Sequence, residues 1–156
     1  MSVQVGQQAP EIELYSEEKE LFKLSDYQGE KDVLLLFFPG AFTGVCTTEL
    51  NTVTNDLAEY GADTQVVGIS TDSPFALGEF KKVNAFAFPL LSDHDAVACA
   101  SYGAKYDNDF TPMKLDRIAK RSAFVVGKDG QIKYAEVLEN AGELPDLEAI
   151  KGVLNG

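Results

Sequence analysis

Residues 33–46 read VLLLFFPGAFTGVC, and this stretch decides the fold. The six apolar residues 33–38 end at a proline, which favours a short strand buried on both faces of a parallel or mixed sheet. A tight Pro/Gly loop follows. From Cys46 to Tyr60, apolar side chains recur at intervals of four, three, four and three residues, which is one face of a helix. Gly61 is a typical C-cap for it. The stretch therefore predicts a buried strand, a tight loop and a helix that carries Cys46 in its first turn.

The segments on either side continue the alternation of strands and helices. Strands are predicted over residues 64–70, 88–91, 122–126 and 131–137, and helices over residues 73–84, over 93–102 and from about 145 onward. Residues 12–14 and 21–24 predict a small hairpin at the sheet edge, and residues 104–120 predict a long loop. This order indicates an α/β fold with a central mixed sheet and helices on both faces. Since no linker or repeat divides the chain, we expect residues 1–156 to form a single domain.

The composition is ordinary for a globular chain, but the charge is strongly acidic. Of 156 residues, 45% are apolar and 24% are charged, and the net charge is −12. A surface of that sign repels phosphate, so we expect no nucleic-acid partner and no binding to anionic membranes. The longest apolar run falls far short of the roughly 18 residues of a membrane span. No secretory signal is visible at the N-terminus. We therefore expect a cytoplasmic protein whose two cysteines are reduced.

Cys46 is the candidate reactive group because of where it lies. Ligands bind in α/β sheets where a strand ends and a helix begins. There, unpaired backbone N–H groups and the positive end of the helix dipole stabilise a thiolate. The alternative is that Cys46 is simply a small buried apolar residue, which is what a free cysteine usually is.

Several other chemistries fail on spacing. A dithiol motif C-x-x-C would need a second cysteine where Glu49 stands, and a cysteine phosphatase loop would need an arginine in place of Thr52. The glycine-rich phosphate-binding loop would need a lysine where Val45 follows Gly44. The only histidine, His94, has no metal-ligand spacing to either cysteine. We expect no metal and no cofactor.

The pattern Pro39-x-x-x-Thr43-x-x-Cys46 resembles the active-site signature P-x-x-x-[TS]-x-x-C of peroxiredoxins, the AhpC/TSA superfamily. The segments QAP at 8–10, FPLLSD at 88–93 and KRSAFVV at 120–126 also resemble that family, in the same order along the chain. The chain is most similar to the one-cysteine alkyl hydroperoxide reductase E branch, and next to the Q-type bacterioferritin-comigratory branch. The resemblance implies a thioredoxin-like fold with an added N-terminal hairpin. It also implies thiol-dependent reduction of hydrogen peroxide and organic hydroperoxides.

The resemblance assigns a role to each site residue. Cys46 would attack the peroxide and become a sulfenic acid. Arg121 would stabilise the thiolate and the charge that develops on the peroxide oxygens. Thr43 would orient the peroxide, Pro39 would shield the sulfur from water, and Glu49 would be a secondary residue that helps to hold the arginine. Without the resemblance, Arg121 would be interpreted as a surface charge, Thr43 as a turn or cap residue and Pro39 as a strand terminator.

The second cysteine does not match the two-cysteine branches. The positions where those branches carry a resolving cysteine hold Asn51 and the cysteine-free segment 75–84. Cys99 lies among alanines, as a small packed core residue does, although a resolving role is the alternative. We therefore expect a one-cysteine mechanism in which an external thiol, or a thioredoxin- or glutaredoxin-type protein, supplies the electrons.

Two further expectations concern assembly and an alternative function. Peroxiredoxins commonly pair through loops around the active site, so the Phe42 loop, the Phe75 region and residues 104–120 are candidate surfaces of a homodimer. The alternative function is a thioredoxin-fold redox sensor or binding module with one oxidisable cysteine and little turnover. A sensor has no need of Thr43 and Arg121, so these two residues favour the peroxidase.

Overall fold

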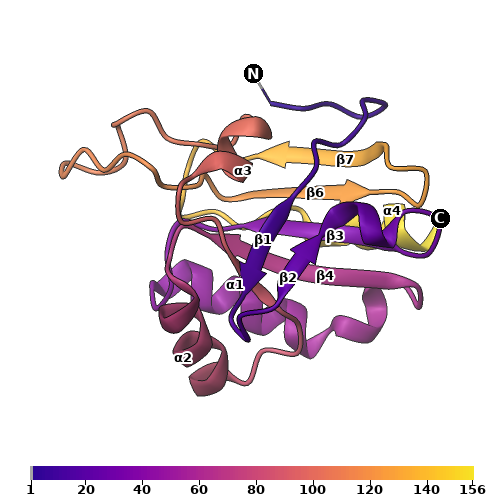
Figure 1. Cartoon of the computed structure of the whole chain (residues 1–156), viewed down its shortest axis with the longest axis horizontal. Coiled ribbons are helices and arrows are strands. Elements are labelled where there is room, and N and C mark those ends of the chain that lie inside the picture. Colours follow the sequence, from indigo (N-terminus) through magenta and orange to yellow (C-terminus); the bar gives the residue numbers. More distant parts are fainter. Residues whose placement is uncertain (1) are drawn as a thin grey trace.

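In a computed structural model, which describes residues 2–156, the apolar run forms β3 (Asp32–Phe37) near the middle of a seven-stranded mixed sheet (Figure 1). It pairs in parallel with β4 (Thr64–Ser70) and antiparallel with β6 (Ser122–Val126). Both neighbours have the bounds that the sequence predicts. Because β3 has partners on both edges and its residues 33–37 are buried, this run of apolar residues lies in the core.

The remaining strands extend the sheet to both sides. The predicted N-terminal hairpin is β1 (Glu13–Ser16) with β2 (Leu21–Lys23), and β1 pairs antiparallel with β5 (Leu90–Ser92). On the other side β7 (Ile132–Val137) pairs antiparallel with β6. The strand order is β2-β1-β5-β4-β3-β6-β7, so the hairpin is an added edge, as predicted.

Helices cover both faces of the sheet, which confirms the predicted fold class. Alternate side chains of β3 point to opposite faces. Leu34 and Leu36 pack with α1 (Gly44–Asn55), α2 (Pro74–Asn84) and α4 (Leu147–Asn155). Leu35 and Phe37 pack with the short helix α3 (Val97–Ser101) and with N-terminal residues. Figure 1 shows α1 and α2 on one side of the strands and α3 on the other.

Helix α2 has the predicted bounds because its start is specified locally. The Ser73 hydroxyl accepts a hydrogen bond from the backbone N–H of Ala76 at 3.2 Å, and Pro74 occupies the first helical position. Proline loses no hydrogen bond there, since that N–H has no partner within the helix. Helix α4 begins at Leu147, two residues after the predicted start, and the Asp146 carboxylate accepts from Ala149 N–H at 3.0 Å.

Helix α1 ends earlier than the spacing of its apolar residues predicts. It stops at Asn55, and a separate 3-10 turn, η2 (Leu57–Tyr60), follows. Asparagine and aspartate are weak helix formers. The Lys151 ammonium on α4 also contacts the carboxylates of Asp56 at 3.4 Å and Glu59 at 3.1 Å. These ion pairs link the turn to α4.

Helix α3 is much shorter than predicted, and its predicted start is wrong. It begins at Val97, because Ala96 has a φ of +60°, which a helix cannot include. Ala96 occupies the N-cap position, but the Asp93 carboxylate still accepts the hydrogen bonds that cap the helix. This buried carboxylate accepts from Ala98 N–H at 2.9 Å and from Cys99 N–H at 2.8 Å. The intervening residues form a turn.

The segment 104–120 contains no regular helix or strand, as predicted, and it precedes β6. Isolated bridges between Lys105 and Ala119 and between Phe110 and Leu115 fold it back on itself, and the ring of Tyr106 stacks on that of Phe110. Another element that the structure adds to the predicted set is the 3-10 turn η1 (Leu24–Tyr27). Within residues 2–156, no helix has the length and apolarity needed to cross a membrane.

Candidate active site

Cys46 lies in the first turn of α1, directly after the loop that leaves β3. Its side chain is completely buried and belongs to the same apolar cluster as Leu50 and Val53 on the same helix. The sulfur therefore lies beneath the loop and near the positive end of the helix, where the partial charge of the N–H groups stabilises a thiolate.

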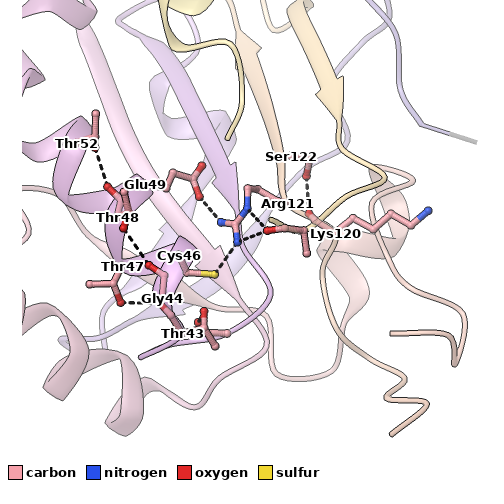
Figure 2. Close-up of polar contacts among 12 residues, drawn as sticks. Thr43, Gly44, Cys46, Thr47, Thr48, Glu49, Thr52, Lys120, Arg121 and Ser122 are labelled. Atoms are coloured by element: carbon pink, nitrogen blue, oxygen red, sulfur yellow. Dashed lines mark hydrogen bonds and ion pairs between the residues drawn. The ribbon is translucent and has the colours of Figure 1, made fainter. Parts of the chain in front are cut away.

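The sheet register brings Arg121 to this sulfur. Phe37, the last residue of β3, pairs with Ser122, the first residue of β6, so Arg121 lies where the loop leaves β3. Its Nη2 donates a hydrogen bond to Cys46 Sγ at 3.2 Å, and only 2% of the residue is exposed. Figure 2 shows the guanidinium group between the helix and the sheet, whereas Lys120 points away from it.

Glu49 and a backbone carbonyl hold the guanidinium in place. Arg121 Nη1 donates to Glu49 Oε1 at 2.7 Å, one helical turn after Cys46. Arg121 Nε and Nη2 donate to the carbonyl of Ala141 at 3.2 and 3.0 Å. Although burial lowers the pKa of Arg121, the neighbouring Glu49 and Cys46 groups raise it, and the net direction is upward. The guanidinium therefore remains charged.

The Glu49 carboxyl is completely buried. Burial is the largest influence on it and raises its pKa to about 7, although the charge and hydrogen bond of Arg121 act in the opposite direction. Within residues 2–156, Oε2 has no hydrogen-bond partner. The structure thus brings Cys46, Glu49 and Arg121 into one cluster.

Thr43 and Pro39 belong to the loop between β3 and α1. Thr43 is the N-cap residue of α1 in extended conformation, and its hydroxyl donates to the carbonyl of Gly40 at 2.8 Å. The lone pairs of the hydroxyl oxygen can still accept a hydrogen bond from the O–H group of a bound peroxide. Thr43 is exposed and Pro39 is buried. The proline has no N–H group to offer to water.

A loop anchor that the sequence analysis missed is Asp72. Its Oδ2 accepts from the backbone N–H of Ala41 at 2.8 Å and from the Ser70 hydroxyl at 2.6 Å. The Ser92 hydroxyl donates to the Asp72 carbonyl at 2.6 Å. Asp72 follows β4, the parallel neighbour of β3, and side chains at the carboxyl ends of adjacent parallel strands lie close together. This rule for parallel strands is the sequence signal that could have identified Asp72. No sequence signal pointed to the carbonyl of Ala141.

The structure does not bring Cys99 to this site. Its side chain is buried in the cluster on the opposite face of the sheet, with Tyr102 and Phe124. Burial, and then the nearby Asp93 carboxylate, raise the pKa of Cys99 to about 12. His94 is also remote from any cluster of ligands. Among residues 2–156, no three side chains of His, Cys, Asp or Glu gather as metal ligands would.

The fold is a mixed sheet flanked by helices, and its site is a thiol at a helix start that accepts a hydrogen bond from an arginine. This combination is that of the thioredoxin-like thiol peroxidases. The AhpC/TSA family matches residues 5–135. Alkyl hydroperoxide reductase E of Mycobacterium tuberculosis is 38% identical over 146 residues, which are 91% of this chain and 90% of that protein. Peroxiredoxin Bcp of Escherichia coli is 34% identical over 85% of this chain and 84% of its own length. The crystal structure of peroxidoxin BcpB from Mycobacterium tuberculosis has a TM-score of 0.80 and 26% identity, with 97% of this chain and 96% of that chain covered.

The chain therefore belongs to the AhpC/TSA family, the peroxiredoxins. Its activity is that of a thiol-dependent peroxidase, whose substrates are a peroxide and a thiol reductant. The matched segment contains Pro39, Thr43, Cys46, Glu49 and Arg121.

Proposed function

We propose that Cys46 is the nucleophile with which this peroxidase reduces hydrogen peroxide and organic hydroperoxides. The observation that carries the proposal is the hydrogen bond of 3.2 Å from Arg121 to the buried sulfur at the start of α1. The thiolate attacks one peroxide oxygen, so that an S–O bond forms and the O–O bond breaks. The electron pair of that bond stays with the second oxygen, which takes a proton and leaves as water or alcohol. The sulfur is oxidised to a sulfenic acid.

Arg121, Thr43 and Pro39 assist this step. Arg121 donates hydrogen bonds to the sulfur and to the charge that builds up on the peroxide. The Thr43 hydroxyl accepts from the peroxide O–H while it donates to Gly40, which orients the O–O bond for in-line attack. Pro39 keeps water from the thiolate. Glu49 holds the guanidinium in the orientation that serves both acceptors.

The recycling step uses an external reductant, as in a one-cysteine peroxidase. The burial of Cys99 on the far face of the sheet supports this, because a disulfide needs Cα atoms within about 7 Å. A reductant thiol attacks the sulfenic acid, releases water and forms a mixed disulfide. A second thiol then releases Cys46 and leaves as the oxidised reductant. A thioredoxin- or glutaredoxin-type protein carries both thiols at one site.

The whole chain, residues 1–156, acts as one domain, which the single seven-stranded sheet supports. It works as a homodimer in the cytoplasm. The exposed rings of Phe42, in the active-site loop, and of Phe75, near the start of α2, support the dimer, at 55% and 72% exposure. Two free thiols suit a reducing compartment.

Intact mass after one equivalent of peroxide, with and without the sulfenic acid trap dimedone, tests this function. We expect one trap adduct at Cys46 in the wild type and in Cys99→Ser, and none in Cys46→Ser, which keeps the fold but consumes no peroxide. Turnover in Cys46→Ser would refute the nucleophile. Loss of two hydrogens with Cys46 and Cys99 linked would refute the one-cysteine scheme. Oxidation without catalytic turnover, with any thiol or thioredoxin-type reductant, would favour the sensor.

A further inference from the structure

The buried cluster has more acidic groups than cations. Cys46 and Glu49 can each carry a negative charge, and both are completely buried. Arg121 is the positive charge that contacts them, at 3.2 Å from the sulfur and 2.7 Å from Glu49 Oε1. If both acids ionise, the cluster carries one uncompensated negative charge in the protein interior. An unpaired buried charge is expensive, and proteins usually avoid it by retaining a proton.

The contacts of Glu49 favour this residue as the one that retains the proton. Oε1 accepts from Arg121, but Oε2 is buried without a hydrogen-bond partner among the described residues 2–156 (Figure 2). A carboxylate oxygen that no donor contacts gains nothing from ionisation, whereas a protonated Oε2 leaves no charge exposed to the apolar core. The thiolate, in contrast, has both the Nη2 donor and the start of the helix to stabilise it.

The surrounding groups do not alter this balance. Among residues 2–156, Arg121 on the β6 side is the charged group that contacts Glu49, and the Ala141 carbonyl accepts from Nε and Nη2 of the same guanidinium. Tyr106, from the segment 104–120, lies near both Arg121 and Cys46, but burial raises its pKa, so its phenol stays neutral at pH 7. The raised pKa of Glu49, about 7, agrees with a carboxyl that holds its proton near neutrality.

We propose that Glu49 stores the proton that peroxide reduction consumes. This inference rests on the proposed role of Cys46. In the reduced enzyme Cys46 is a thiolate and Glu49 is a neutral carboxylic acid. When the thiolate has become a neutral sulfenic acid, Glu49 is the one anionic partner that Arg121 has within residues 2–156, and the carboxyl ionises. The reactants are the Cys46 thiolate, the peroxide and the Glu49 carboxylic acid. The products are the Cys46 sulfenic acid, water or an alcohol, and the Glu49 carboxylate.

The same proton returns during recycling. Two reductant thiols convert the sulfenic acid to the Cys46 thiol, with release of water and of the oxidised reductant disulfide. The thiol then ionises, and its proton reprotonates Glu49. Glu49 is thus a positioning residue for Arg121 that also changes its protonation state once in each turnover.

Proton uptake measured with a pH-indicator dye tests this proposal. Weakly buffered, reduced enzyme is mixed with one equivalent of hydrogen peroxide slightly below neutral pH, and dimedone labelling measures the sulfenic acid formed. We expect wild-type enzyme to take up little acid from solution. Glu49→Gln should take up about one proton per sulfenic acid, because the neutral amide has none to give. Glu148→Gln removes a carboxyl whose side chain is 85% exposed, and should behave like the wild type.

Equal proton uptake by the wild type and Glu49→Gln would overturn the proposal. If Glu49→Gln does not fold or react, infrared difference spectra of the wild type still decide. Oxidation should remove the carbonyl stretch of a protonated carboxylic acid and create the stretching band of a carboxylate. The absence of these two changes would overturn the proposal. Failure of the proposed function would look different, because Cys46 would then form no sulfenic acid in the wild type.

Discussion

At the scale of single residues, Arg121 contacts three acceptors with one rigid group. Losing one preorganised donor from such a site typically costs about 100- to 1,000-fold in rate. We therefore expect Arg121→Ala to slow peroxide attack by that order, measured by stopped-flow oxidation of Cys46. Arg121→Lys should recover only part of the rate, because an ammonium cannot reach the sulfur and Glu49 with the same planar geometry.

The matched control for Arg121 is its neighbour Lys120, whose side chain points away from the cluster (Figure 2). Lys120→Ala should react at the wild-type rate. A wild-type rate in Arg121→Ala would show that the arginine takes no part in the reaction. Since Arg121→Ala leaves Glu49 buried without its partner, its folded fraction is measured first, by circular dichroism.

Glu49 should also make stability depend on pH. Its pKa is raised to about 7 in the folded protein from 4.5. The folded state therefore holds the proton more tightly, so this stabilising contribution is fully present below about pH 4.5 and is lost as pH rises through about 7. We expect urea unfolding of the reduced protein to show a decline on the order of a few kcal/mol across this range.

Glu49→Gln has no proton to lose and should remove that decline, with Glu148→Gln as the control that keeps it. Parallel pH profiles for the wild type and Glu49→Gln would contradict the assignment of the pKa.

Local sequence pattern was sufficient to predict part of the active site. A thiol in the first turn of a helix could be recognised from residues 33–46, and the family resemblance added Arg121 and Glu49. Their contact depends on the pairing of β3 with β6, which local pattern does not specify. Asp72 was missed for a related reason, because its bond to Ala41 spans the gap between two parallel strands.

At the scale of elements, the active-site loop is held at two points. Asp72 accepts from Ala41 N–H, and the Phe42 ring packs on Phe80 with the ring centroids 5.0 Å apart. Phe42 has a φ of +66°, a conformation that costs a non-glycine residue about 1–2 kcal/mol. The loop therefore keeps its shape through these contacts and not through its own backbone preference.

Asp72→Ala should release this loop. Two donors lose their acceptor, so we expect a loss of about 1–3 kcal/mol in stability. Peroxide attack should slow by up to about 100-fold, since small misplacements of reacting groups are that costly. Chemical denaturation and stopped-flow oxidation measure the two effects. Asp63→Ala, which removes an exposed carboxylate, is the control, and an unchanged rate in Asp72→Ala would show that the loop needs no anchor.

The elements that were predicted well are those whose ends are specified locally. Strand β4 and helix α2 have the predicted bounds, and Ser73 with Pro74 explains the start of α2. The C-terminal end of α1 and the start of α3 were mispredicted because long-range contacts influence them. Ion pairs of Lys151 link η2 to α4, and the Asp93 carboxylate caps α3 from the other side of an intervening turn.

At the scale of the whole molecule, the fold class followed from the order of strands and helices, whereas the homodimer stays a prediction. Phe75 and Val83 lie on the same helix α2 and are both exposed, at 72% and 64%. Burying a phenylalanine in an interface contributes about 1.5–3 kcal/mol. We expect sedimentation equilibrium to give twice the chain mass of 16.9 kDa, and Phe75→Glu to weaken the dimer at least about tenfold.

Val83→Glu, which adds the same charge on the same helix, should leave the dimer intact. A monomeric wild type, or equal weakening by both substitutions, would contradict the assignment of the interface to the start of α2.

The sheet also separates two thiols that can be counted independently. Cys46 reports the oxidation state of the site, whereas Cys99 reacts with an alkylating reagent only when the layer containing α3 opens, because it is buried and its pKa is raised to about 12. In a timed alkylation experiment, the mass of the peptide containing Cys99 thus records how often that layer opens in solution. A single sample can therefore show whether oxidation at Cys46 loosens or tightens the opposite face.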